Sequence, residues 1–100
     1  MADIRYSRSV PKAIPFEWWQ AGEVAPIDCS TFVCAIDRTT LPWMPTVQAI
    51  NPALGKYQIG APSEAQAAQM QLGKRYGVHV VLRSAGGVAT EEFDLTLVAV

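Results

Sequence analysis

The chain has 100 residues, of which 50% are hydrophobic and 17% charged, and its formal net charge is −1. This length fits one domain with a core of its own, and the near-neutral charge argues against a general nucleic-acid binder, which needs a basic surface. The charged share lies below the roughly 25% usual for a soluble domain. Either a partner covers part of the surface or a monomer has a well-filled core.

The sequence contains no segment typical of membrane insertion or secretion. No apolar run approaches the roughly 20 residues of a membrane helix, and the first ten residues, MADIRYSRSV, hold no apolar leader segment. We therefore expect a protein that is made in the cytoplasm and does not contact a membrane.

An N-terminal arm is predicted at residues 1–12, followed by a folded domain at residues 13–100. The arm holds a short alternating run in which Ile4 and Tyr6 are the large apolar members. So few apolar side chains give the arm little to hold it on its own domain. We expect it to lie on a neighbouring subunit, as an added strand or an extended clamp.

The stretch IPFEWWQ, residues 14–20, predicts an edge strand, because Pro15 has no N–H to give to a ladder. Trp18 has the parity of the other large apolar residues, so we expect it in the core, whereas Trp19 faces away. An outward tryptophan is covered either by a loop or the arm, or by a partner, since exposed aromatic residues are enriched at protein interfaces. The same alternatives hold for Trp43 in the link LPWMP.

Alternating apolar residues predict further strands within residues 30–38, 46–51, 55–60, 75–84 and 90–100, and AGG at 85–87 predicts a hairpin turn. Outward positions on the fourth of these include His79, Val81 and Arg83. The side chains expected to face the core are Phe32, Cys34 and Ile36, then Tyr76, Val78, Val80 and Leu82, and finally Phe93, Leu95, Leu97 and Ala99.

One short helix is predicted at about residues 64–72. Ser63 is placed to cap it, Gln66 completes a capping box, and Gly73 stands where a left-handed stop is expected. The helical stripe expected to pack consists of Ala65, Ala68 and Leu72. About seven short strands, one short helix and frequent turns predict an all-β fold, an antiparallel sandwich of the immunoglobulin-like kind.

Catalysis finds little support in the residues, and we expect no enzyme, cofactor or metal site. His79 is the only histidine, and no nucleophile motif accompanies it. Glu91 and Glu92 are neighbours in a strand, so they point to opposite faces. Cys29 and Cys34 do not have the spacing of a zinc or redox pair, and we expect two free thiols with Cys34 buried.

A succession of short motifs runs through residues 13–100: IPFEWW, APIDCSTFVCAI, NPALGKYQIG, APSEAQAAQMQLGKRYGVHVVLRS, AGG and EFDLTLVAV. In order and spacing this succession resembles the small immunoglobulin-like domains found at the N-terminus of phage baseplate upper proteins and in related tailed-phage structural proteins. The resemblance implies that the hydroxyl of Tyr76 bonds to nearby backbone, as in a tyrosine corner. The chain departs from the family in having VPKA where a Gly-Asp pair is usual, and in ending with its last strand.

The resemblance implies a non-enzymatic structural protein of a tailed-bacteriophage virion, attached to tail, neck, baseplate or capsid and made in the host cytoplasm. Its partners would be other virion proteins and copies of itself in a symmetric assembly. The residues expected at the interface are Ile4, Tyr6, Trp19 and Trp43. The alternative is a small phage- or prophage-encoded binding module or inhibitor that targets a host protein.

Overall fold

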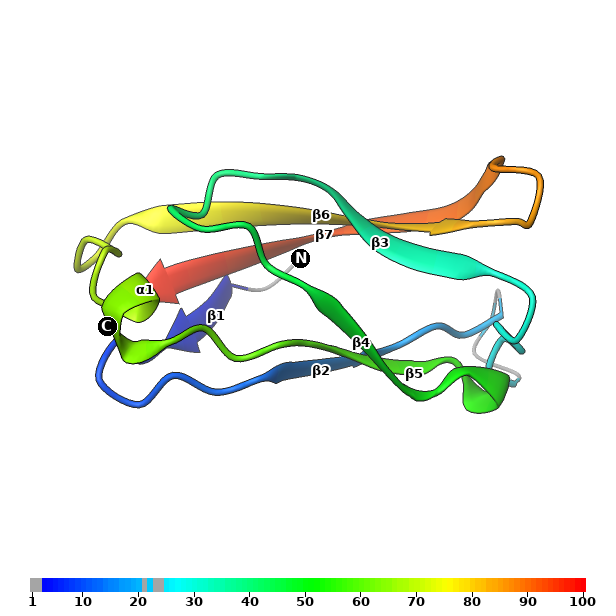
Figure 1. Ribbon diagram of the computed structural model, residues 1–100, viewed down its shortest axis with the longest axis horizontal. Coiled ribbons are helices and arrows are strands. Elements are labelled where there is room, and N and C mark those ends of the chain that lie inside the picture. Colours follow the sequence, from blue (N-terminus) through cyan, green and yellow to red (C-terminus); the bar gives the residue numbers. More distant parts are fainter. Residues whose placement is uncertain (1–2, 21, 23–24) are drawn as a thin grey trace.

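Seven strands in two layers form the computed structural model, which describes residues 3–20, 22 and 25–100 (Figure 1). In spatial order, the larger sheet holds β1 (Asp3–Tyr6), β7 (Ala89–Ala99), β6 (Arg75–Arg83) and β3 (Val33–Thr39). The smaller sheet holds β2 (Ile14–Glu17), β5 (Lys56–Ile59) and β4 (Val47–Asn51). The expected link at residues 21–28 and the start of the expected arm lie partly outside the described residues.

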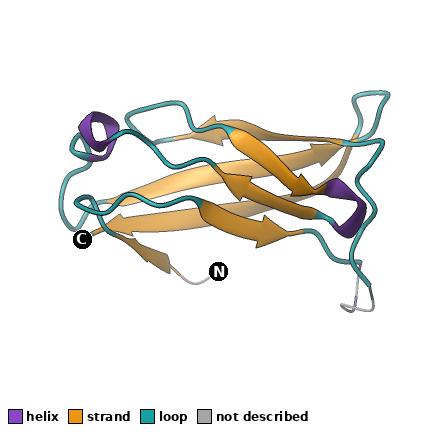
Figure 2. Ribbon diagram, turned by 60° about the horizontal axis from the view of Figure 1, so that its bottom comes forward, coloured by secondary structure: helices purple, strands orange, loops and turns teal. Residues whose placement is uncertain are grey.

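The distribution of the strands over the two sheets is that of an immunoglobulin-like sandwich, with the third, sixth and seventh strands in one sheet and the second, fourth and fifth in the other. The predicted fold class is therefore confirmed. One pairing differs from the expected antiparallel arrangement, because β1 runs parallel to β7. Figure 2 shows the sheets facing each other, with α1 (Glu64–Ala67) and the short helix η2 (Pro52–Leu54) at opposite ends.

The prediction of a free N-terminal arm is wrong for residues 3–6, because they form β1, an edge strand of the chain's own larger sheet. Ile4 pairs with Leu97, and Tyr6 pairs with Ala99. The side chain of Tyr6 is only 6% exposed and belongs to the core. Arg8 extends this attachment, since its guanidinium donates to the carbonyl of Ala68 over 2.8 Å. The first strand is thus held by backbone pairing and by a buried ring, neither of which needs a neighbouring subunit.

The core lies between the sheets and contains the inward positions that alternation predicted. Tyr76, Val78, Val80 and Leu82 of β6 are buried in one cluster with Leu95, Leu97 and Ala99 of β7, and Phe93 packs against it. The outward assignment was incomplete, because His79 and Val81 are buried as well. These two residues lie on the central part of the larger sheet, between β7 and β3. The ladders place Asp94 and Arg38 beside His79, and Glu92 and Ala35 beside Val81.

An aromatic cluster joins the two sheets near the end of β2. The ring of Trp18 lies 5.1 Å from that of Phe93 and 6.1 Å from that of Phe16, and Phe16 stacks on Tyr57 at 5.9 Å between ring centroids. The indole N–H of Trp18 also points to the sulfur of Cys34, at 3.4 Å. Trp18 is 5% exposed, so its predicted place in the core is confirmed.

The helix is shorter than predicted and buries different residues. The capping box of Ser63 and Gln66 is present, but α1 ends at Ala67. The chain then continues through turns, in which the N–H of Met70 bonds to the carbonyl of Ala67. Ala67 and Met70 are buried, whereas Leu72, in the expected stripe, is exposed. Ala65 and Ala68, the other members of the expected stripe, are exposed as well, so the predicted stripe lies on the outward side of this segment.

The connection after α1 ends as the helix pattern predicted for Gly73 and as the resemblance implied for Tyr76. Gly73 has a left-handed φ of 80°, which a residue with a side chain adopts only at a cost. The hydroxyl of Tyr76 accepts the backbone N–H of Gln71 over 2.8 Å, so the bond to nearby backbone is confirmed. The buried ring of Tyr76 therefore anchors this connection to the start of β6.

Candidate interaction surfaces

One end of the sandwich, which we call the loop end, gathers three connections: residues 18–20 with 25–32, residues 52–55 with η2, and the β6–β7 hairpin at residues 84–88 (Figure 1). The backbone N–H of Trp18 bonds to the carbonyl of Gly55, and that of Cys29 bonds to the carbonyl of Pro52. These bonds hold the first two connections together. Loops held on a rigid sandwich are a common place for binding residues.

Trp19 is the exposed aromatic residue of the loop end. Its side chain is 44% exposed, and its indole N–H donates to the carboxylate of Glu17 over 2.8 Å. An isolated backbone bridge joins Trp19 to Pro26. The outward orientation is confirmed. Residues 3–6 of the expected arm pair with β7 in the other sheet, so they do not cover this ring.

Further large apolar side chains are exposed on segments that meet at the loop end. Ile50 stands at a bulge near the end of β4, and Val33 begins β3. Exposed apolar side chains and an exposed tryptophan at one end of a domain are typical of a protein-binding surface. The exposed apolar side chains on these segments are Trp19, Val33, Ile50, Leu54 and Val88.

Trp43 lies away from the loop end. Its side chain is half-buried and packs against the core. It lines a small pocket with Gly60, Pro62 and Gln66, on the connection that leads to α1. Because α1 and η2 lie at opposite ends of the sandwich (Figure 2), the structure does not bring Trp43 and Trp19 into one surface.

Ile4 and Tyr6 lie on a third part of the molecule, beside a groove of about 460 Å³ between the edges of β1 and β2. Tyr6 forms the wall of this groove, and its hydroxyl bonds both the carbonyl and the N–H of Lys12, at 2.7 and 3.0 Å. Burial raises the pKa of Tyr6, against a smaller lowering by the bond with Lys12. Ile4 is half-buried. Of these two residues, Ile4 is the one with surface left for a partner.

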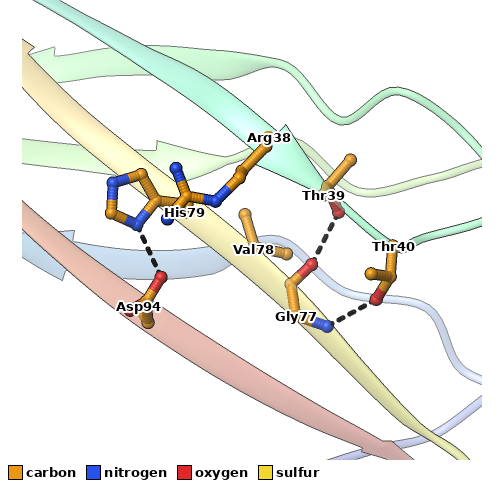
Figure 3. Close-up of a pocket in the computed structure, with 7 residues that line it drawn as sticks. All are labelled: Arg38, Thr39, Thr40, Gly77, Val78, His79 and Asp94. Atoms are coloured by element: carbon orange, nitrogen blue, oxygen red, sulfur yellow. Dashed lines mark hydrogen bonds and ion pairs between the residues drawn. The ribbon is translucent and has the colours of Figure 1, made fainter.

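A polar cluster on the outer face of the larger sheet surrounds His79 (Figure 3). The Nδ1 atom of His79 lies 2.6 Å from a carboxylate oxygen of Asp94, and its Nε2 atom lies 3.8 Å from a carboxylate oxygen of Glu92. Arg38 lines the same pocket from β3. His79 is 7% exposed although it points away from the core. The Nδ1 atom is thus satisfied by a residue of its own sheet.

The geometry around His79 serves cross-strand pairing better than catalysis. His79 and Asp94 are direct partners in the β6–β7 ladder. The hydroxyls of Thr39 and Thr40, which line the pocket, are engaged with the carbonyl and the N–H of Gly77, each at 2.8 Å. A nucleophile needs a base within hydrogen-bond reach, and neither of these two hydroxyls is bonded to the imidazole.

The two cysteines are free thiols, as predicted, but their burial differs from the prediction. Cys29 is buried, whereas Cys34 is half-buried because β3 is an edge strand. Burial raises the pKa of Cys34 to about 11, against a lowering by the N–H of Trp18, and it raises the pKa of Cys29 as well. Burial also raises the pKa of Tyr57, beside them, to about 12. High thiol pKa values disfavour the reactive thiolate.

Two absences hold for the part of the chain that the structure describes. Its histidine, cysteine and acidic side chains do not gather in a group of three or more suited to a metal ion. Among the same residues, no helix is long and apolar enough to cross a membrane.

Comparison with known proteins gives no relative for this chain: no family model, no curated protein and no solved structure matches it.

Proposed function

We propose that this chain is a non-enzymatic structural protein that acts through protein–protein contacts, in the tailed-phage virion that the sequence resemblance implies. The observation that carries the proposal is Trp19, a tryptophan that is 44% exposed at the loop end, where segments with further exposed apolar side chains also meet. Tryptophan is enriched among the residues that dominate binding energy. The partners we propose are other virion proteins and copies of this chain.

The polar residues of the chain support a binding role over an enzymatic one. His79 is engaged by Asp94, its partner in the ladder. The thiol of Cys34 has a pKa raised by burial to about 11, which keeps it protonated near neutral pH. The bond between Tyr76 and the N–H of Gln71 agrees with the feature that the resemblance implied.

The proposal is tested on purified particles of the phage or prophage that encodes the chain. Mass spectrometry of the particles should find this chain in a fixed ratio to the tail or capsid proteins. If the chain is abundant in infected cells but missing from particles, the virion role is wrong. Its recovery in a stable complex with one host protein would instead support the small inhibitor or binding module.

The binding surface is tested in the same particles with two matched variants. Trp19→Ala should remove the chain from particles while leaving its melting temperature nearly unchanged, because the side chain is exposed. Leu72→Ala removes an exposed apolar side chain near Gly73, away from the loop end, and should leave incorporation intact. Equal incorporation of both variants would contradict a role for Trp19 in assembly.

A further inference from the structure

The strand β1 has one paired side and one open side. β1 stands at the end of the strand order of the larger sheet, and the described residues provide no strand beyond it. Figure 2 shows its ribbon at the margin of the molecule. An open strand edge presents unpaired N–H and C=O groups that can bind another strand.

The other three sheet edges carry features that hinder pairing. The register of β3 shifts at a bulge between Ile36 and Arg38, and that of β4 shifts between Ala49 and Asn51. Pro15 in β2 has no backbone N–H. Bulges and prolines are two of the devices by which proteins protect sheet edges from pairing. Among the four described edges, β1 alone has neither device.

The backbone of β1 directs alternate residues to the open side. The carbonyl of Tyr6 accepts the N–H of Val100 over 3.0 Å, and the N–H of Arg8 bonds to the carbonyl of Val100 over 3.2 Å. The peptide groups of Tyr6, and by alternation those of Ile4, therefore face β7. The peptide groups of Asp3 and Arg5 face the open side.

The side chains of the same two residues are exposed and opposite in charge. We propose that two copies of this chain pair antiparallel along β1, across a two-fold axis at Ile4. In this register Asp3 of each copy stands opposite Arg5 of the other, and each such pair exchanges backbone hydrogen bonds on the open side. A two-fold contact needs a self-complementary surface, and the sequence Asp3-Ile4-Arg5 is one.

The side chains around the open edge support this register. Asp3 already accepts the guanidinium of Arg75 over 2.8 Å, and an ionised carboxylate has room for a second donor. At the centre, the two copies of Ile4 would form a closely spaced, non-hydrogen-bonded pair. Ile4 lines the apolar groove with Val10 and Ile14, so the pair would cover surface that water contacts in a single copy. The ion pairs alone would add little, since exposed pairs contribute about 0–1 kcal/mol.

This inference goes beyond the proposed function and holds whether or not the chain belongs to a virion. The test is the mass of the purified protein in solution over a concentration series, by native mass spectrometry and analytical ultracentrifugation. The wild-type chain should form a dimer. Arg5→Asp places two acidic pairs across the axis, and Asp3→Arg places two basic pairs there, so each variant alone should lose the dimer.

Two recoveries then identify the register. A mixture of Arg5→Asp and Asp3→Arg should form a heterodimer, because each acidic residue again faces a basic one. The double variant Asp3→Arg/Arg5→Asp should form a homodimer for the same reason. The control is Arg38→Asp at β3, the opposite edge of the same sheet, which should leave the dimer unchanged. Melting temperatures verify that every variant is folded.

Three outcomes would overturn the proposal: a wild-type chain that stays monomeric throughout the series, a dimer that survives Arg5→Asp, or folded single variants that do not combine. Loss of particle incorporation by Trp19→Ala would leave these results untouched, because Trp19 lies outside β1. Failure of the dimer and failure of the virion role are therefore distinguishable.

Discussion

The two sheets of the sandwich differ in how they treat their outer faces. In the smaller sheet the outward side chains of Glu17, Gln48 and Lys56 are exposed. Its strands β2 and β5 alternate between core and solvent, and β4 is exposed from Gln48 to Asn51. In the larger sheet, β6 is buried on both faces, with His79 and Val81 covered on the outer one. Side chains of neighbouring strands can cover the outer face of a central strand. The alternation of apolar residues within that strand does not predict this burial.

The two faces of β6 are buried in different ways. The inner face of β6 packs apolar against apolar across the sandwich. On the outer face, the ladder places His79 beside Asp94 and Arg38, and Val81 beside Glu92 and Ala35. Long polar side chains bury a neighbour by lying over it, and they can move. We therefore expect substitutions on the outer face to cost less stability than those on the inner face.

The largest expected effect comes from the adjacent tryptophans that follow β2 of the smaller sheet. Trp18→Ala should lower the free energy of unfolding by about 3–5 kcal/mol, because it empties the aromatic cluster at Phe93 and Phe16. Trp19→Ala is the matched control and should cost less than about 1 kcal/mol, since its ring is exposed. Denaturant unfolding measures both. Equal losses would mean that the loop end is part of the core.

The next effect compares the two faces of the larger sheet directly. Leu95→Ala, on the inner face, should cost about 2–5 kcal/mol as a large-to-small core substitution. Val81→Ala, on the outer face, should cost about 1–2 kcal/mol, near the transfer value for the buried carbon atoms that it removes. If the valine proves as costly as the leucine, the outer face is packed as tightly as a second core.

A smaller effect is expected at the connection after α1. Tyr76→Phe keeps the buried ring but removes the oxygen that accepts the N–H of Gln71. Leaving a partly buried donor without its partner costs about 1–3 kcal/mol. Hydrogen exchange should show faster exchange at Gln71 than in the wild-type chain, with the β6–β7 ladder still protected. Unchanged exchange at Gln71 would show that this bond is not what holds the connection.

The strands and their inner faces could be predicted because alternation is local. Each run of apolar residues at every second position, such as Val78, Val80 and Leu82, records its own inner face. Ile4 and Tyr6 show the same alternation, yet the attachment of β1 was not predictable. Its partner β7 lies at the far end of the sequence, and the sequence of one short strand does not determine which strand it pairs with.

The candidate surfaces were predictable only in part, for a related reason. Strand parity placed Trp18 inside and Trp19 outside, as the structure shows. Parity says nothing about residues in loops, so the half-buried position of Trp43 and the distance between it and Trp19 required the fold. The burial of His79 depends on the pairing of β6 with β3 and β7. A single sequence does not state those registers.

The smallest expected effect is a loss of stability at alkaline pH, caused by the thiol of Cys34 on the half-buried edge strand. Burial raises its pKa in the folded chain from the ordinary 9.0 to about 11. Between these two values the unfolded chain releases the thiol proton while the folded chain keeps it. The free energy of unfolding therefore falls as pH rises through this window, and the full contribution is present below it.

Cys34→Ala isolates this contribution, because every other titrating group is shared with the wild-type chain. The difference in unfolding free energy between the two proteins should be constant near neutral pH and should shrink from pH 9 toward about 11. Measured by denaturant unfolding at each pH, a constant difference throughout would mean that solvent reaches the sulfur as it does in the unfolded chain. In that case β3 would open at its edge, and a thiol reagent would label Cys34 rapidly in the native protein. Slow labelling, together with a difference in unfolding free energy that shrinks as pH rises, would show that Cys34 is protected from solvent like the inner face of the larger sheet.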